Sequence, residues 1–171
     1  MPTQEPTSSL HDNIYGLAVK LFPLHRSLTG DGVRQTLREI KRLLPEMSVL
    51  EVPSGTNAFD WKVPDEWNIR DAYILDEAGN KMVDYKENNL HVLAYSEPVD
   101  KVVTLEELNE HLYSLPDQPE AIPFVMSYYQ RRWGFCLTHS KRRLLKEGRY
   151  RVFIDSTLKP GFLTYGELVL P

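Results

Sequence analysis

The apolar residues of this chain first follow the period of helices and then that of short strands. One face of a predicted helix over residues 14–22 is apolar, and Pro23 ends this helix. A second helix is predicted over residues 31–44, where apolar side chains recur every three or four positions. Residues 48–52 then form a predicted strand. Helix, helix and strand are an opening typical of an α/β domain.

The middle of the chain has the pattern of short strands joined by turns. Residues 72–75 and 81–85 flank a loop of five residues and are predicted to pair as a hairpin. Residues 90–95 are predicted to form a further strand. The segment Thr104–Glu107 has the sequence of a capping box, which predicts a short helix over about residues 105–113.

The C-terminal third continues this alternation of strands and turns. Residues 133–138 and 150–154 are predicted strands, and a short helix is predicted from Ser140 to Gly148. The turn at Lys159–Gly161 is expected to fold residues 162–170 back onto the preceding strand as a hairpin. Short strands with turns between them predict a mostly β unit in this part of the chain.

The predicted elements divide the chain into unequal parts of an α+β protein. Residues 1–9 are predicted to be a flexible leader, and the mostly β unit spans about residues 56–160. Residues 1–53 bury little apolar surface by themselves, and the strand pattern at 167–170 runs up to the last residue. We therefore expect both ends to pack against polypeptide that this sequence does not contain.

Composition places the chain among globular proteins. With 171 residues and 42% hydrophobic residues, it can bury a core without disulfides. No apolar stretch approaches the roughly 18 residues of a membrane span, and the first ten residues lack the pattern of a signal peptide. A single cysteine, Cys136, fits a reducing compartment. We expect a cytoplasmic protein without a membrane partner.

Charge is unevenly distributed along the chain, although the net charge is only −4. Residues 51–120 hold 16 acidic and 5 basic side chains, whereas residues 131–151 hold 8 basic and 1 acidic. Nucleic-acid-binding domains usually have a basic excess throughout, and the isoelectric point here is about 5.7. We expect solvated or paired charge and no nucleic-acid partner. The alternative, nucleic-acid binding through residues 131–151, predicts an affinity that falls steeply with salt.

Single residues with reactive side chains give few candidates for chemistry. The five histidines lack the spacing of a zinc motif, and Glu107 and His111 are expected to be a surface pair. Cys136 lies in an apolar strand pattern, where a thiol is more often a buried filler than a nucleophile. His91 alternates with apolar neighbours, which favours a core or edge histidine over a role in a pocket. The Gly30–Gly32 segment is expected to be a helix-entry turn.

Two clusters combine aromatic rings with arginines. Residues 59–71 contain two tryptophans, several aspartates and an arginine, and residues 128–133 interleave aromatic side chains with two arginines. Such groups suit stacking on sugars, bases or peptide planes and binding of carboxylates. The alternative is that the rings belong to the core and that Arg–Asp pairs brace loops.

Several segments together resemble a family of bacterial aminopeptidase-like proteins that is often encoded among polysaccharide-biosynthesis genes. The segments that carry the resemblance are Leu21–Gly30, Glu51–Thr56, Phe59–Trp61, Trp67–Tyr73, Asn89–Val92, Ser127–Tyr129, Arg132–Cys136 and Thr164–Glu167. The resemblance implies an α/β zinc-exopeptidase domain, here incomplete, that is interrupted by a mostly β inserted domain. Residues 10–55 would begin the peptidase domain, residues 56–160 would be the insert, and residues 161–171 would return to the peptidase sheet.

The resemblance also implies that the metal ligands lie outside this chain, because in that family they follow the strand at which the chain ends. Zinc is therefore implied for the full-length family, and no metal ligand and no catalytic residue are expected within these 171 residues. The chain alone is expected to be catalytically inert. Its partner would be the remainder of the aminopeptidase-like domain, and a homo-oligomer stays open.

The contribution expected from this chain is one wall of a substrate cleft. The substrate would be a peptide, an amide or a sugar-linked small molecule. The candidate substrate-binding residues are Asp60, Arg70, His91, Arg131 and Trp133. The alternative function is a free-standing module that holds a glycan or peptide with its aromatic–arginine clusters.

Overall fold

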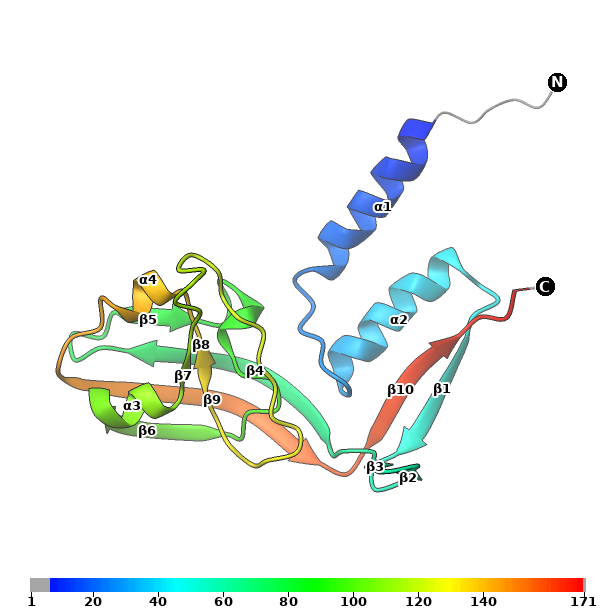
Figure 1. Ribbon diagram of the computed structural model, residues 1–171. Coiled ribbons are helices and arrows are strands. Elements are labelled where there is room, and N and C mark those ends of the chain that lie inside the picture. The colour runs from blue at the N-terminus through cyan, green and yellow to red at the C-terminus, as the bar shows by residue number, and fades with distance from the viewer. Residues whose placement is uncertain (1–6, 171) are drawn as a thin grey trace.

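The computed structural model of the protein describes residues 7–170 (Figure 1). It begins with helix α1 (Thr7–Leu21), so the last three residues of the predicted leader are helical, and residues 1–6 lie outside the described part. Helix α2 (Asp31–Leu43) follows after a loop. Both helices confirm the prediction from apolar spacing. No helix within the described range has both the length and the apolar character needed to cross a bilayer.

Strand β1 (Ser48–Pro53) pairs antiparallel with strand β10 (Phe162–Glu167), although 108 residues separate them. The prediction that residues 162–170 fold back on the strand before them is therefore wrong. The chain turns toward β1 because the Ser54 N–H donates to the Gly161 carbonyl at 2.9 Å, and the Gly161 N–H donates to Ser54 Oγ at 3.0 Å. These bonds close a two-stranded ribbon at one end of the molecule (Figure 1).

In the sequence, the strands of a four-stranded antiparallel sheet lie between β1 and β10. Its order is β5 (Lys81–Asp84), β4 (Glu66–Leu75), β9 (Arg149–Lys159) and β6 (Val99–Thr104). The hairpin predicted around residues 76–80 is confirmed, since β4 and β5 pair directly. Alternate residues of β4 and β9 are buried, the period of strands with one face on a core.

The core is formed by one face of this sheet and the segments that cover it. Its fully buried large side chains include Ile74, Val152 and Ile154 from the sheet and Phe135 and Leu137 from the covering segments. Strand β7 (Leu112–Tyr113) pairs parallel with β8 (Phe135–Cys136) in this cover. A small hairpin of β2 (Asn57–Ala58) and β3 (Trp61–Lys62) follows strand β1 in the sequence. The molecule is thus an α+β protein.

Several short elements differ from the sequence-based prediction. Residues 90–95 are not a strand: the 3-10 helix η1 (Asn89–His91) is followed by single bridges at Val92 and Ala94. The backbone turns at Tyr95, whose φ is 68°, so a regular strand cannot continue there.

Two helices predicted in the β unit exist but are shorter than expected. Helix α3 (Leu105–Glu110) has the predicted cap, with Thr104 Oγ1 accepting from the Glu107 N–H at 3.2 Å. It ends early because the next residues pair in β7. Helix α4 (His139–Arg142) is capped by Thr138 rather than by Ser140.

Candidate functional site

The loop between α1 and α2 lies against the start of β4. Thr29 Oγ1 accepts from the Trp67 N–H at 3.1 Å and bonds with the Tyr95 hydroxyl at 2.7 Å. Asn68 Oδ1 accepts from the Asp31 N–H at 2.7 Å, at the first residue of α2. Gly30 between them has φ 99°, and a Cβ there would collide with the Trp67 carbonyl oxygen. Glycine is therefore required for the loop to approach the strand this closely.

An ion pair fastens α2 to the same strand. Arg34 Nη2 donates to Glu66 Oε1 at 2.6 Å, and Nη1 donates to Glu66 Oε2 at 3.0 Å. Hydrogen bonding from Arg34 outweighs burial and lowers the pKa of Glu66 to about 2. The carboxylate therefore stays charged at neutral pH, and the helix is held over β4.

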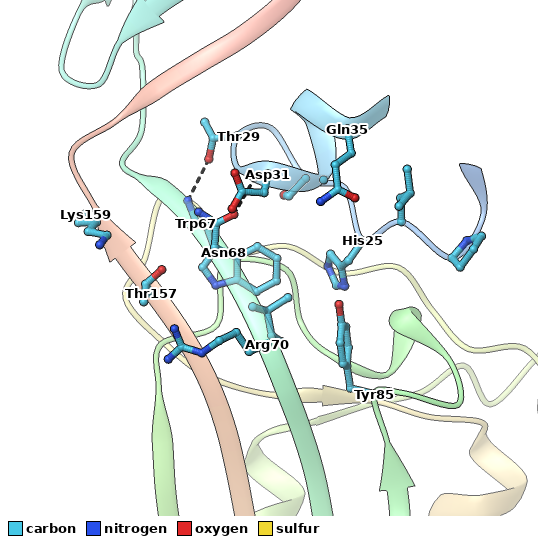
Figure 2. A pocket seen from close by; sticks show the side chains of 15 residues that line it. His25, Thr29, Asp31, Gln35, Trp67, Asn68, Arg70, Tyr85, Thr157 and Lys159 are labelled. Atoms are coloured by element: carbon cyan, nitrogen blue, oxygen red, sulfur yellow. Dashed lines mark hydrogen bonds between the residues drawn. The ribbon is translucent and has the colours of Figure 1, made fainter. Parts of the chain in front are cut away.

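A cavity of about 520 Å³ opens between this loop, α2 and strands β4 and β9 (Figure 2). Figure 2 shows His25 and Tyr85 on one side of it and Arg70, Thr157 and Lys159 on the other. The volume lies within the roughly 300–1,000 Å³ that is usual for small-molecule sites. We take this cavity as the candidate site.

Two loop residues that line this cavity are half-buried, and each has one polar atom without a hydrogen-bond partner. Both His25 Nδ1 and Ser27 Oγ are inaccessible and unpaired among the described residues. The His25 ring packs edge-on against Trp67, with centroids 5.0 Å apart, and lies 5.4 Å from the Tyr85 ring. Burial lowers the pKa of His25 to about 4, so its imidazole is neutral at neutral pH.

Charged groups occupy the rim of the cavity. Arg70 donates through Nε to Asp155 Oδ2 at 2.7 Å and through Nη2 to Oδ1 at 2.5 Å. Asp31 accepts from Arg34 Nη2 at 2.7 Å. Arg70 at the rim is thus balanced by Asp155, whereas Arg34 is shared between Asp31 and Glu66, and Lys159 is the remaining charged lining residue.

Of the five substrate-binding candidates predicted from the sequence, Arg70 lines this cavity. Arg131 lies elsewhere: its Nη2 donates to Asp65 Oδ2 at 3.1 Å beside a smaller hollow of about 160 Å³. Asp60 lines another surface hollow, next to Trp61 and Tyr129.

The remaining two candidates belong to the packed interior. His91 is 3% exposed, and its Nδ1 bonds with the Cys136 carbonyl oxygen at 2.7 Å. Trp133 is 9% exposed and stacks on His111 with centroids 3.6 Å apart. The structure therefore does not bring the five candidates into one site.

Metal ligands and nucleophiles are scarce in the described residues. Within residues 7–170 no three His, Cys, Asp or Glu side chains are grouped so that they could hold a metal ion. These residues therefore do not fit a zinc site. Cys136 is fully buried, and burial raises the pKa of its thiol to about 12, so it is a filler of the core as expected.

Sequence reasoning missed several of the residues that line the cavity. His25 and Ser27 lie in the Leu21–Gly30 segment that carries the family resemblance, which was the available signal. No sequence pattern pointed to Tyr85 as a residue of the site. Its ring meets the loop through tertiary packing, which spacing along the chain does not reveal.

The model of one protein family, described as a domain of unknown function (DUF2172), matches residues 66–157. This match runs from the first residue of β4 nearly to the end of β9 and covers more than half of the chain. The chain belongs to the DUF2172 family. Of the lining residues of the cavity, those of β4, Tyr85 and Thr157 lie within the matched part of this DUF2172 chain, Lys159 follows it, and the loop and α2 precede it.

Two matches from Clostridium acetobutylicum extend over almost all of the DUF2172 chain. A protein with the provisional name polysaccharide biosynthesis protein with aminopeptidase-like domain is 49% identical over 161 residues, which is 94% of this chain. A crystal structure at 2.37 Å of a protein provisionally named a peptidase is also 49% identical and covers 93% of this chain with a TM-score of 0.89. The DUF2172 chain spans 37% of the length of each.

Proposed function

We propose that this chain is the N-terminal portion of a zinc-dependent aminopeptidase-like hydrolase. In this proposal α1, α2, β1 and β10 belong to the hydrolase domain, and residues 56–160 are an inserted domain that shapes one wall of the substrate cleft. The names of the two Clostridium proteins, and the fact that the chain spans 37% of each, support the proposal. The observation that carries it is the exposed apolar face of the β1–β10 ribbon.

The register of the ribbon divides its side chains between two faces. Gly166 lies close to Leu37 of α2 and to Met47, so the helix covers this face of the ribbon at β10. Leu50 is opposite Tyr165 in the ladder, and both point to the other face because side chains alternate along a strand. Their exposed fractions are 37% and 41%. An apolar pair on an uncovered sheet face calls for a second layer.

The edges of the ribbon support the same conclusion. Among residues 7–170, β1 and β10 pair with each other and with no further strand. A two-stranded ribbon is at best marginally stable alone, and in α/β domains such strands belong to a wider sheet that is covered on both faces. Helix α1 adds exposed apolar side chains at Ile14, Tyr15 and Val19. We propose that the remainder of the aminopeptidase-like domain covers these surfaces.

In this proposal the zinc ligands lie in that remainder, since the described residues do not fit a zinc site. Hydrolysis is assigned to groups outside this chain, and the chain alone is inert. Its own contribution is to position the inserted domain beside the cleft. Ser54 and Gly161 lie near the two positions at which the chain enters and leaves the proposed inserted domain. They hold these positions together, because each donates a hydrogen bond to the other.

A chimera tests the proposal. The full-length Clostridium relative would carry this chain in place of its own matching segment, and hydrolysis of leucine p-nitroanilide would be measured with and without added zinc. We expect the chimera to unfold in one cooperative transition and to hydrolyse the substrate, whereas this chain alone does not. The variant Leu50→Glu places a charge on the proposed contact and should abolish the cooperative transition or the activity.

The matched control is Val102→Glu on β6, because Val102 is 52% exposed on a different sheet. This variant should behave as the parent chimera does. The proposal is wrong if the chimera fails to fold, or if Leu50→Glu changes it no more than Val102→Glu does. Zinc-dependent hydrolysis by the isolated chain would also overturn the assignment of the metal site.

A further inference from the structure

We propose that Phe59, at the tip of the β2–β3 hairpin, docks into an apolar pocket of the remainder of the aminopeptidase-like polypeptide. This inference rests on the proposed function and deepens it, because it names the side chain that anchors the contact. Three observations carry it: the backbone conformation of Phe59, the complete exposure of its ring, and the attachment of the hairpin to the β1–β10 ribbon.

The backbone of Phe59 is in a conformation that its side chain disfavours. Its φ is 57°, in the left-handed region that glycine and asparagine adopt more readily than an aromatic residue does. Among residues 7–170, one other residue apart from glycine has a φ in this region, Tyr95 with 68°. Such backbone strain persists only where contacts of the folded protein compensate for it.

Contacts within the chain compensate for the strain at Tyr95 but not for the strain at Phe59. The Tyr95 ring is buried and stacks on Trp67 with centroids 5.8 Å apart, and its hydroxyl bonds with Thr29 at 2.7 Å. The Phe59 side chain is fully exposed, so it gains no packing from the described residues. The compensating contact for Phe59 therefore comes from outside them.

The hairpin that carries Phe59 is fastened to the end of the ribbon. The Gly55 N–H donates to the Val63 carbonyl oxygen at 2.8 Å, and the Val63 N–H donates to the Thr56 carbonyl oxygen at 2.9 Å. Figure 1 shows β2 and β3 beside the end of β1. The exposed apolar face of this ribbon is the surface assigned above to the remainder of the hydrolase, so the hairpin lies at the margin of the same contact.

The shape and chemistry of the tip favour a folded polypeptide as its partner. Phe59 projects from a two-residue loop, whereas small molecules are bound by concave sites. Beside the loop is a surface hollow lined by further aromatic rings, of which Tyr129 is 75% exposed. Exposed aromatic side chains are typical of protein interfaces, where a few of them contribute most of the binding energy. The chain spans 37% of each Clostridium relative, and the rest of such a polypeptide supplies the pocket in this proposal.

The variant Phe59→Asn tests the inference, because its effect should depend on whether the remainder is present. Asparagine removes the ring and tolerates a left-handed backbone better than phenylalanine does. In the isolated chain the melting temperature should be unchanged or raised by up to about 4 °C, since strain is relieved and no contact is lost. In the full-length chimera it should fall by at least about 3 °C, since the pocket loses its occupant.

The matched control is Leu144→Asn, which removes a 70% exposed apolar side chain from the turn that follows α4. It should lower the melting temperature no further in the chimera than in the isolated chain. Phe59→Leu keeps an apolar side chain at the tip and should restore part of the melting temperature of the chimera. The inference is overturned if Phe59→Asn destabilises the isolated chain as much as the chimera, or leaves the chimera unchanged.

Two other occupants of the tip are outcomes of the same test, and either would overturn the inference. A Phe59→Asn chimera that melts like its parent but has a raised KM for leucine p-nitroanilide would place the ring against the substrate. A dimer of the isolated chain that Phe59→Asn abolishes, measured by sedimentation, would place it against a second copy. If Leu50→Glu disrupts the chimera and Phe59→Asn does not, this inference alone fails, whereas a parent chimera that does not fold refutes the hydrolase proposal as well.

Discussion

His25 shows how one residue links the candidate site to the stability of the fold. Its pKa is about 4 in the folded chain and 6.5 without burial, as in the unfolded chain, because burial disfavours the charged imidazole. Between these values the unfolded chain binds more protons than the folded one, so stability falls as the pH is lowered from 6.5 toward 4. His91 is also buried with a lowered pKa and acts in the same direction.

We therefore expect the free energy of unfolding to drop by about 2 kcal/mol or more from pH 7 to pH 5. Urea unfolding at the two pH values measures this drop. In His25→Gln it should shrink by more than half, since the titrating group is removed. Glu66, whose pKa is lowered to about 2, titrates below this window and should not contribute. An unchanged drop in the variant would contradict a buried neutral His25.

At the level of single residues, some assignments could be made from the sequence and others could not. Burial of Cys136 was predicted because apolar neighbours flank it in a strand pattern, and the structure confirms it. The aromatic–arginine clusters could not be resolved in advance. Trp67 and Trp133 proved to be core residues, whereas Arg70 remained at the surface with Asp155. Whether a ring faces the core depends on the partner strand, which local sequence does not specify.

At the level of elements, two arginine–carboxylate pairs of similar geometry should differ in their effect on stability. Arg34–Glu66 joins α2 to β4, and the two side chains are 24% and 14% exposed. Arg70–Asp155 joins β4 to β9, with 69% and 32% exposed. Exposed pairs contribute about 0–1 kcal/mol, whereas charge-assisted hydrogen bonds shielded from water contribute about 1.5–3 kcal/mol.

We therefore expect Arg34→Gln to lower the free energy of unfolding by about 1–3 kcal/mol, and Arg70→Gln to lower it by less than about 1 kcal/mol. Urea denaturation of the two variants gives the comparison. The double variant Arg34→Gln/Glu66→Gln should be less destabilised than the sum of the single variants, because no unpaired carboxylate is left. Equal effects at both arginines would show that α2 is not fastened through this pair.

Elements with a local signal were predicted well, and elements defined by distant partners were not. The helix starting at Leu105 follows from its capping box, which acts within four residues. The failed strand at residues 90–95 is apolar enough, but its backbone is shaped by bridges to Phe135 and Met126. Pairing of β10 with β1 was likewise beyond local pattern, because hydrogen bonds around Gly161 redirect the chain.

At the level of the whole molecule, the structure has two parts that differ in how well they are shielded from solvent. The four-stranded sheet has a buried core that includes Ile74 and Val152, both fully inaccessible. In the β1–β10 ribbon, residues 48–51 are all exposed, and α2 covers the face that carries Gly166. Segments with few buried apolar contacts open at lower free energy than the core.

Native-state hydrogen exchange should therefore resolve two cooperative units in the isolated chain. We expect amides of the β4–β9 ladder to exchange only with global unfolding, and amides of the β1–β10 ladder to open at a free energy at least about 2 kcal/mol lower. In the full-length chimera the ribbon should slow to the level of the sheet, because its Leu50–Tyr165 face is then covered. Equal protection of both ladders in the isolated chain would mean that the ribbon needs no further layer, and the proposed docking of a hydrolase domain would lose its physical basis.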